Sequence, residues 1–409
     1  MVETADVVVI GGGVNGASIA YALAARGVRR VVLLEKGAMA SGASGRSSAL
    51  VRMHYTNEWD ARLAFASFPI FRNWREIMGG PPVFTHNAFV TVVAPAYAAA
   101  LRANVEMLRG IGVNTSALTP RELAEIEPAI NIDDLGAAAY EPDGGYANPA
   151  DTVEGFRRRA TELGAEVRQW TTVTGIVRRE SRVIGVETTT GRIDAGAVVV
   201  AAGAWAPHLC REIGLPLPAR PKALDTVLVT RPPDLPKHLT VIDNVQGTYL
   251  RPESGILTIV GVPCPVWDID PDTMPTGLPP EAPAVGAQLL MRRFPAMERA
   301  TLSRGYRAFD CYSGDRHAIL GGVDGIDRLY LATAFSGSGF KIAPAVGACM
   351  AELITDGRAK TVDIDAFNLR RFARGATVEG PHPYAPRPDH VVVSSADPGA
   401  SRPDSAARS

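Results

Sequence analysis

Three glycines and one glutamate near the start of the chain have types and spacing suited to holding a dinucleotide. Gly11, Gly13 and Gly16 follow the spacing G-x-G-x-x-G, and Glu35 comes one strand later. Glycines permit a sharp turn and let backbone amides approach a pyrophosphate, because no Cβ stands in the way. A carboxylate at that distance from the turn accepts hydrogen bonds from ribose hydroxyls. The pattern predicts a dinucleotide site, and an ordinary tight turn is the alternative interpretation.

The elements around these residues must bring them to one edge of a sheet. The β-branched run 6–10 predicts a buried parallel strand, and 14–26 predicts a helix that ends at Gly27. The run 31–34 predicts the next strand, with Glu35 at its end. Phosphates would lie at the helix N-terminus, where unpaired amides and the helix dipole favour anions. This order of strand, turn, helix and strand is more specific than the glycine spacing alone.

Three later stretches combine small residues with groups that suit a polar cofactor. The segment 41–48 is a serine- and glycine-rich loop. The apolar strand 198–200 ends in the small residues 201–204, which permit close contact with a flat ligand, although a close-packed strand end has the same composition. The Gly-Ser-Gly turn at 337–339 leads into a helix at 343–355. A helix N-terminus there can stabilise negative charge that develops on a cofactor.

Composition and charge narrow the class of protein. The chain has 409 residues, a hydrophobic fraction of 46% and a formal net charge of −1, with no basic run. We therefore expect neither nucleic acid nor an anionic membrane as a partner. No uncharged apolar run reaches the length of a membrane span, and no signal-peptide features precede the first strand. The four cysteines are scattered without a C-x-x-C pair, so free thiols, no metal centre and a cytoplasmic location are expected.

The rest of the chain predicts a second domain inserted into the first. Over 224–309, strands alternate with proline-rich loops, which is typical of an antiparallel sheet. We expect an α/β fold with a Rossmann-like domain built on a parallel sheet and a second, α+β substrate domain with a largely antiparallel sheet. The predicted ranges are 1–82, 149–220 and 312–375 for the discontinuous first domain, 83–148 and 221–311 for the substrate domain, and 376–409 for a flexible tail.

Five motifs in a fixed order resemble one family. They are VVVIGGGVNGASIA…LLEK, SGRSSALVR, VVVAAGAWAP, GDRHAILGG and FSGSGFKIAPAVG, within residues 5–372. The chain resembles the FAD-dependent D-amino acid oxidase superfamily, in the branch of sarcosine oxidases, glycine oxidase and N-methylglycine dehydrogenases. An enzyme that binds NAD alone would have the first motif without the last two. The resemblance implies bound FAD and oxidation of the C–N bond of an amino acid or N-alkylated amino acid. Hydride transfer to the flavin would give an imine that hydrolyses.

The resemblance also implies where FAD lies. Glu35 is expected on the adenosine ribose, Val173 at the adenine side, 46–48 near the pyrophosphate and flavin, and 337–341 beside the isoalloxazine. The expected cofactor-binding residues are Gly11, Gly13, Val14, Asn15, Gly16, Glu35, Lys36, Ser44, Arg46, Ser47, Ser48, Val173, Ala202, Gly203, Trp205, Gly337, Gly339, Phe340 and Lys341. Some relatives bind flavin through a cysteine whose position is Ala308 here, so non-covalent FAD is expected.

The resemblance assigns the substrate site as well. Arg52 and Lys341 match the pair that holds the substrate carboxylate, Arg as a planar bidentate partner and Lys as a point charge. A structural salt bridge for Arg52 and a surface position for Lys341 are the alternatives. Tyr249 matches an active-site aromatic, with core packing as its alternative role, and His54 is a further catalytic candidate. Weaker candidates are Tyr55, Arg251, Tyr312 and His317.

The electron acceptor stays open at this stage. Oxidases of the sarcosine type activate oxygen with a lysine on the strand after the active-site aromatic, and 255–262 contains no lysine. A FAD dehydrogenase subunit that passes electrons to a partner protein or quinone is therefore one alternative. A non-catalytic flavoprotein module is another. The sequence does not name the amine or the oligomeric state.

Overall fold

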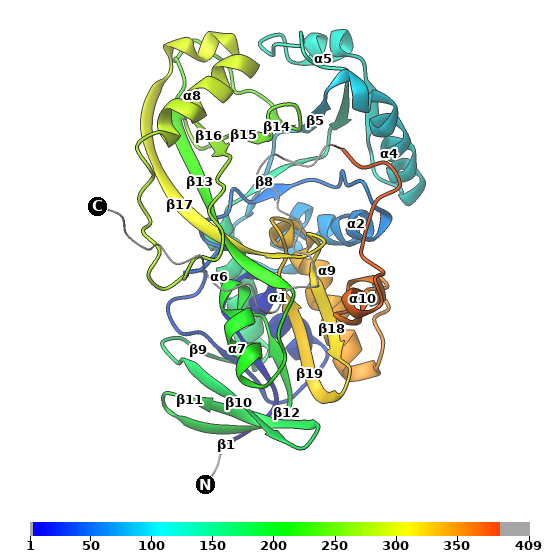
Figure 1. Cartoon of the computed structure of the whole chain (residues 1–409), viewed down its shortest axis with the longest axis vertical. Coiled ribbons are helices and arrows are strands. Elements are labelled where there is room, and N and C mark those ends of the chain that lie inside the picture. The colour runs from blue at the N-terminus through cyan, green and yellow to red at the C-terminus, as the bar shows by residue number, and fades with distance from the viewer. Residues whose placement is uncertain (1–2, 385–409) are drawn as a thin grey trace, which may run out of the picture.

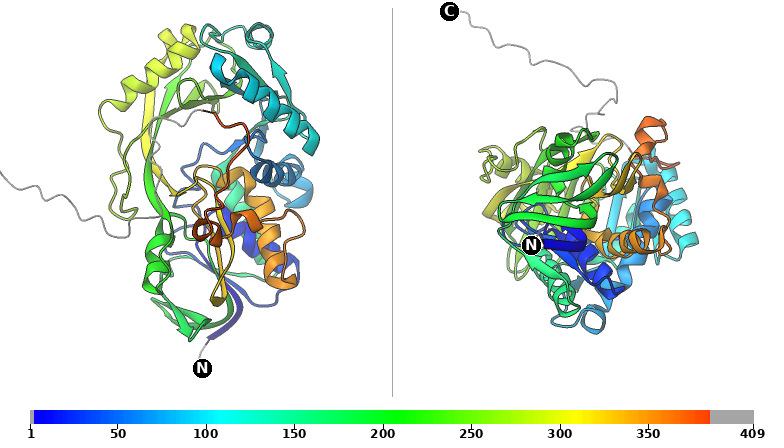
Figure 2. Two further views of the ribbon diagram at one scale, coloured as in Figure 1. Left: turned by 45° about the vertical axis from the view of Figure 1, so that its right-hand side comes forward. Right: turned by 90° about the horizontal axis from the view of Figure 1, so that it is seen from below.

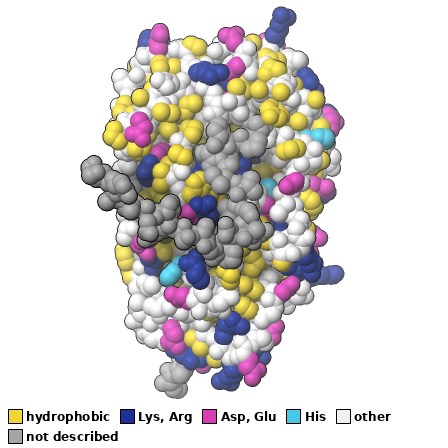
Figure 3. All heavy atoms as spheres, viewed as in Figure 1, with side chains coloured by type: hydrophobic (Ala, Val, Ile, Leu, Met, Phe, Trp, Pro, Cys, Tyr) yellow, Lys and Arg dark blue, Asp and Glu magenta, His cyan; other side chains and the backbone are white. Residues whose placement is uncertain are grey.

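Two eight-stranded sheets, with helices packed on them, form most of the part of the chain that the structure describes. The structure is a computed structural model and describes residues 3–384. In Figure 1 the first sheet, with β1 and β12, lies at one end, and the second sheet, with β5 and β15, lies at the other. Basic and acidic side chains are interspersed over the face seen in Figure 3, in keeping with the net charge of −1.

The first sheet has the strand order β10-β11-β19-β12-β1-β2-β9, with β18 paired to β19. β1 lies parallel to both of its neighbours, and Val8 is level with Val198 on one side and Val32 on the other. The strands are β1 (Glu3–Ile10), β2 (Val31–Leu34), β9 (Glu166–Arg168), β10 (Val173–Arg179), β11 (Arg182–Thr188), β12 (Gly191–Val200), β18 (Ile319–Val323) and β19 (Ile326–Thr333).

Helices cover both faces of this sheet, so β1 is buried on both sides, as its β-branched run predicts. Val7 and Val9 join the core made with α1, α2, α6 and α9. Val8 and Ile10 join the core on the opposite face, which includes α7. Figure 2 shows the same arrangement from two further directions. The bounds are α1 (Val14–Ala25), α2 (Glu58–Arg72), α6 (Pro149–Glu162), α7 (Ala206–Glu212) and α9 (Gly339–Asp356).

The second sheet has the order β17-β13-β16-β15-β14-β5-β7-β6, and only β14 and β5 pair in parallel. Helices α5 and α8 cover one face, and α4 packs on β5 and β7 through Leu101 and Val105. The elements are β5 (Phe89–Val93), α4 (Ala98–Ile111), β6 (Ser116–Leu118), α5 (Pro120–Ile126), β7 (Ala137–Glu141), β13 (Ala219–Thr230), β14 (Thr240–Asp243), β15 (Thr248–Pro252), β16 (Leu257–Val262), α8 (Ala282–Arg293) and β17 (Thr301–Ser313).

Two long antiparallel strands, β13 and β17, reach from the second sheet toward the first, as Figure 1 shows in green and yellow. At the end of β17, Tyr312 bridges to Phe335, just before α9. A small third sheet joins β3 (Leu50–Val51), β8 (Gly145–Ala147) and β4 (Phe84–His86). Two short α-helices, α3 (Trp74–Ile77) and α10 (Arg370–Ala373), and several 3-10 turns lie between the larger elements. These connections bring residues from distant parts of the chain to the space between the two large sheets.

The expected α/β class is confirmed, with a first sheet centred on parallel strands and a largely antiparallel second sheet. β13 and β17 run across the predicted limits at 220 and 312, so the exact domain division remains a proposal. Within residues 3–384, no helix combines the length and the apolar character needed to cross a bilayer.

The start of the predicted tail differs from the expectation. The segment 376–384 is docked on the fold: the Ala376 amide donates to the Arg371 carbonyl over 2.9 Å, and the Val378 amide donates to Asp315 over 3.0 Å. Composition gave no sign of the Asp315 anchor, because that partner lies 63 residues away in the sequence. The remainder of the predicted tail, 385–409, lies outside the described residues.

Candidate active site

The glycine turn between β1 and α1 is closed so tightly that side chains are excluded. Gly11 has φ +112°, and a Cβ there would lie 2.5 Å from the Ala201 carbonyl oxygen. A Cβ on Gly16 would lie 1.9 Å from the Gly11 oxygen. The first amide of α1, that of Val14, donates to Ser44 Oγ over 2.9 Å. The turn therefore presents backbone rather than side chains at the carboxyl edge of the sheet, where ligands of such sheets bind.

Glu35 stands at the end of β2 with its carboxylate fixed by backbone amides. Its Oε2 accepts from the Gly12 amide over 2.6 Å, and its Oε1 accepts from the Gly37 amide over 2.8 Å. The carboxylate is therefore oriented before any ligand arrives, with lone pairs left to accept hydroxyl donors.

The serine- and glycine-rich loop folds over this edge. Arg46 donates to the Gly42 carbonyl over 3.1 Å, and its guanidinium lies 5.4 Å from the centre of the Phe309 ring. The Tyr306 hydroxyl donates to the Arg46 carbonyl over 3.2 Å. Strand β17 thus holds the loop from the side of the second sheet, and Ser44, Arg46, Ser47 and Ser48 all line one cavity.

The other side of the cavity is closed by a contact between the two halves of the fold. The Lys36 ammonium lies 4.7 Å from the Trp205 ring centre. Asp272, from the loop before α8, pairs with Lys36 and accepts from Trp205 Nε1 over 3.0 Å. Val173, Ala202 and Gly203 line the same part.

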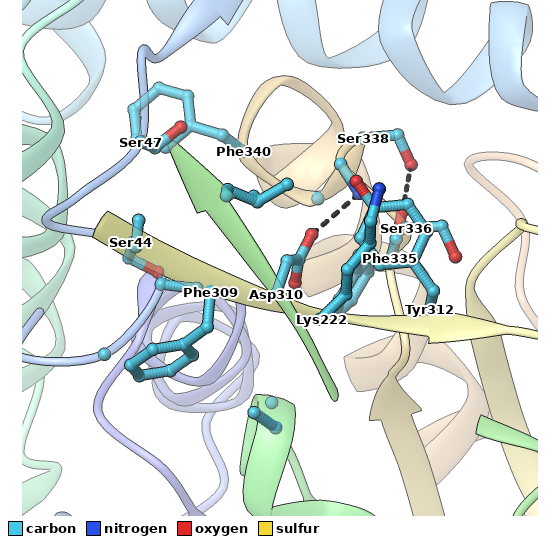
Figure 4. Close-up of a pocket in the computed structure, with 18 of the residues that line it drawn as sticks. Ser44, Ser47, Lys222, Phe309, Asp310, Tyr312, Phe335, Ser336, Ser338 and Phe340 are labelled. Carbon is cyan, nitrogen blue, oxygen red and sulfur yellow. Dashed lines mark hydrogen bonds between the residues drawn. The ribbon is translucent and has the colours of Figure 1, made fainter. Parts of the chain in front are cut away.

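The turn before α9 forms the third side. Gly337 has φ +85°, and its amide donates to Asp310 Oδ2 over 2.7 Å, the bond dashed in Figure 4. The Asn15 side chain donates to the Gly339 carbonyl over 3.3 Å, so the N-termini of α1 and α9 meet at the cavity. Burial, the largest influence, raises the pKa of Asp310 to about 6. Figure 4 shows Asp310 close to Lys222, Phe335 and Tyr312.

These residues fit a dinucleotide cofactor. All of the expected cofactor-binding residues line one cavity of about 850 Å³ except Gly16, which instead packs under the turn. Two helix N-termini supply amides and positive dipole ends for anionic groups. Asn15 Oδ1 is buried and has no hydrogen-bond partner in the described part of the chain, as expected for an acceptor that meets a ligand.

Arg52 and Lys341 come together around one aromatic ring. The Arg52 guanidinium carbon lies 4.6 Å and the Lys341 ammonium 5.9 Å from the ring centre of Tyr55. Lys341 is only 6% exposed, so it is not a surface lysine. Within residues 3–384 no carboxylate forms an ion pair with Arg52, whose Nε also has no partner. A half-buried guanidinium and a buried ammonium beside one cavity favour an anionic ligand, because both can donate charge-assisted hydrogen bonds to it.

Tyr249, on β15, forms a wall of the part of the cavity that contains Arg52 and Lys341, which is called the chamber below. Its ring lies against Gly261 of β16, where a Cβ would be 2.2 Å from the ring carbon Cε1. Its hydroxyl is 3.4 Å from Thr226 Oγ1. The ring therefore both packs on the sheet and lines the cavity, which combines the two interpretations that the sequence left open.

His54 lies in the cavity wall with one ring nitrogen already engaged. Its Nε2 is 2.8 Å from the Tyr384 hydroxyl. Burial first, and then the charge of Arg52, lower the pKa of His54 to about 3. The ring is therefore neutral near pH 7 and acts as a hydrogen-bonding group rather than a cation.

The weaker catalytic candidates from the sequence divide into two groups. Tyr55, Tyr312 and His317 line the cavity, and His317 Nδ1 lies 2.6 Å from Asp60 Oδ2. Arg251 does not line it: its guanidinium lies 4.3 Å from the Tyr146 ring centre and pairs with Glu253. Arg251 is a packing residue in this structure.

Sequence reasoning missed four residues at or under the site: Asp310, Lys222, Glu141 and Tyr384. Lys222 lies 5.4 Å from the ring centre of Tyr312 and lines the cavity. No local motif marks any of them, because strand pairing or a long return of the chain carries each one there. Strand alternation would not have singled out Asp310 either, because its neighbour Phe309 also lines the cavity.

Comparison with known proteins agrees with this geometry. Residues 6–353 match the family model described as FAD dependent oxidoreductase, and the chain belongs to this family. It is 26% identical to mouse FAD-dependent oxidoreductase domain-containing protein 1, over 92% of this chain and 86% of that protein. It is 27% identical to the sarcosine oxidase subunit beta of Arthrobacter sp, over 91% and 92% of the two chains.

A similar solved structure is L-proline dehydrogenase from P. horikoshii, with a TM-score of 0.84 and 28% identity, over 92% of this chain and all of that one. The protein is therefore a FAD-dependent oxidoreductase of the group that contains amino acid oxidases and dehydrogenases. The expected family and the FAD cofactor are confirmed.

Proposed function

We propose that the protein oxidises the C–N bond of an amino acid or N-alkylated amino acid. The observation that carries this proposal is the pair of cations, the half-buried Arg52 and the buried Lys341, that both lie close to the Tyr55 ring and line one cavity. A carboxylate is the anion that such a substrate offers, and Arg binds it through two parallel N–H donors. Tyr249 would form the opposite wall, beside the amine.

FAD bound in this cavity would supply the acceptor for the hydride of the substrate Cα–H, and loss of a proton from the amine nitrogen would then give an imine. Water then adds to the imine carbon, and the amine leaves. The residues of the chain orient the substrate, and holding the Cα–H at a fixed position accounts for most of what the protein must supply. Arg52 and Lys341 would set that position from the carboxylate end. The neutral His54 is a hydrogen-bonding part of the wall.

An anaerobic comparison of an amino acid with its methyl amide tests the proposal. We expect the acid to bleach the flavin absorbance at least ten times faster than the amide at equal concentration, because only the acid pairs with both cations. Equal rates would contradict carboxylate recognition and favour an amine dehydrogenase. Complete absence of bleaching by a broad set of amines would favour the non-catalytic flavoprotein.

Transfer of electrons to a partner protein or quinone is a second candidate for the oxidative half-reaction. It is supported by the absence of lysine from β16 and by the similarity to an L-proline dehydrogenase. Rapid reduction of an artificial dye with little oxygen consumption would favour this acceptor, and rapid oxygen consumption would favour an oxidase. A cytoplasmic location is part of the proposal, and the four cysteines, all buried free thiols, are compatible with it.

A further inference from the structure

The segment 376–384 crosses from the first half of the fold to the second. After α10 it is anchored through the Val378 amide on Asp315. Gly380 then passes so close to the loop before α2 that a Cβ on it would lie 1.9 Å from the Thr56 carbonyl oxygen. In Figures 1 and 2 this segment, in orange-red, rises from α10 toward α4. It ends, within the described residues, at Tyr384.

Tyr384 is held in one orientation by four contacts. Its hydroxyl lies 2.8 Å from His54 Nε2 and accepts from the Asn104 side chain of α4 over 3.2 Å. Its ring stacks on the His54 ring, with centres 6.0 Å apart and planes 11° apart, and meets the Tyr97 ring edge-on at 6.4 Å. Asn104 also donates to the His382 carbonyl over 2.9 Å, which fixes the backbone just before the ring.

This position places Tyr384 in the wall of the chamber that contains Arg52 and Lys341. Pro383 and Tyr384 line the same cavity as Arg52 and Lys341. The link is short, because Arg52 donates through Nη1 to the carbonyl of His54, and the His54 ring contacts the Tyr384 hydroxyl. When the substrate carboxylate binds Arg52, the rest of the substrate must fit between the two cations and the surrounding walls of the chamber. Tyr384 forms one of these walls.

We propose that Tyr384 is a specificity-determining residue whose ring limits the size of the substrate in the chamber beside Arg52. The inference rests on the proposed function, since it takes the carboxylate to lie on Arg52 and Lys341. Shortening the side chain would open space toward α4 that a longer substrate could fill. A hydrophobic wall of this kind discriminates by about tenfold or more for each methylene gained or lost.

The test uses the holoenzyme and straight-chain carboxylates from acetate to hexanoate, with binding read from the change in flavin absorbance. For Tyr384→Ala we expect the ratio of Kd for hexanoate to Kd for acetate to fall at least tenfold relative to wild type. Tyr384→Phe keeps the ring and should keep the wild-type ratio. His382→Ala is the matched control, because its side chain is exposed on the same segment.

An unchanged ratio in Tyr384→Ala would overturn the inference while leaving carboxylate recognition intact. If no carboxylate perturbs the wild-type flavin, carboxylate recognition fails, and this inference falls with it. Should Tyr384→Ala lose its FAD, Tyr384→Leu carries the same comparison, since Leu still packs on the apolar neighbours in α4. In Tyr384→Ala, kcat/KM for a long-chain amino acid should likewise rise relative to kcat/KM for a short-chain one.

Discussion

The Gly12 amide donates to Glu35 Oε2 over 2.6 Å, so the glycine turn itself orients the carboxylate at the end of β2. Turn and carboxylate act as a unit, because the same side chain also accepts from the Gly37 amide. A change at Glu35 should therefore affect cofactor binding through two routes: the loss of an acceptor for ribose hydroxyls, and looser amides in the turn.

For Glu35→Ala we expect FAD binding to weaken by about 1–3 kcal/mol, the cost of leaving polar partners without a charged acceptor. Titration of the apoprotein with FAD measures the change. Glu166→Ala, at an exposed carboxylate on the neighbouring β9, is the matched control and should bind FAD normally. Unaltered affinity in Glu35→Ala would remove this residue from the cofactor site.

The flavin should be released by acid precipitation. Ala308 lines the cavity and carries no nucleophile, which agrees with the expectation that no cysteine links the flavin at this position. Cys311 is fully buried, and burial raises the pKa of its thiol well above the ordinary value, so it is not a thiolate. We expect all flavin fluorescence in the supernatant. Fluorescence that stays with the denatured chain would show a covalent link and point first to Cys311.

Replacing Arg52 or Lys341 should impair catalysis with little loss of cofactor. A charge-assisted hydrogen bond contributes about 1.5–3 kcal/mol, so Arg52→Ala and Lys341→Ala should each lower kcat/KM about ten- to a hundredfold. Lys341 also lies in the first turn of α9, beside the Gly337 turn, so its variant should shift the flavin spectrum as well. Arg62→Ala, an exposed site on α2, is the control. Variants that lose stability yet keep kcat/KM would indicate purely structural roles.

Glu141 should make the folded state less stable as the pH rises. It is fully buried, its Oε1 accepts from the Met53 amide over 2.7 Å, and burial raises its pKa from 4.5 to about 7. Between these values the folded state binds more protons than the unfolded state, so the free energy of unfolding falls as pH increases. The full effect is of order 3 kcal/mol, complete above about pH 7.

Urea unfolding of the holoenzyme at pH 5 and pH 8 measures this dependence. Glu141→Gln should reduce this pH dependence. Relative to wild type, the free energy of unfolding of the variant should therefore rise by about 1–3 kcal/mol from pH 5 to pH 8. Glu125→Gln, at an exposed glutamate of α5, should leave the pH dependence unchanged. A parallel pH dependence in wild type and Glu141→Gln would contradict the assignment.

The parts of the site that sequence could predict are those built from local patterns. The run from β1 through α1 to β2 brings Gly11 and Glu35 together within one short unit, so spacing alone is informative. The serine-rich loop and the Gly337 turn were likewise recognisable as motifs, and the structure brings them to the same cavity.

Asp310 and Tyr384 could not be found in this way. Asp310 reaches the Gly337 amide because β17 pairs with β13 and ends at the Phe335 bridge, which is a matter of register between distant segments. Tyr384 depends on Asn104 and His54, both hundreds of residues earlier in the chain. No periodicity in a proline-rich segment encodes such partners.

The place of β1 inside the first sheet has a consequence for synthesis of the protein. Val8 pairs beside Val198, so the strand that carries the glycine turn leaves the ribosome 190 residues before that neighbour. At about 5–20 residues per second, one edge of β1 stays unpaired for roughly 10–40 s, together with the apolar face that α7 later covers. An unpaired apolar strand is an aggregation hazard. The nascent chain should therefore need chaperone protection over this interval, and fragments that stop before β12 should precipitate.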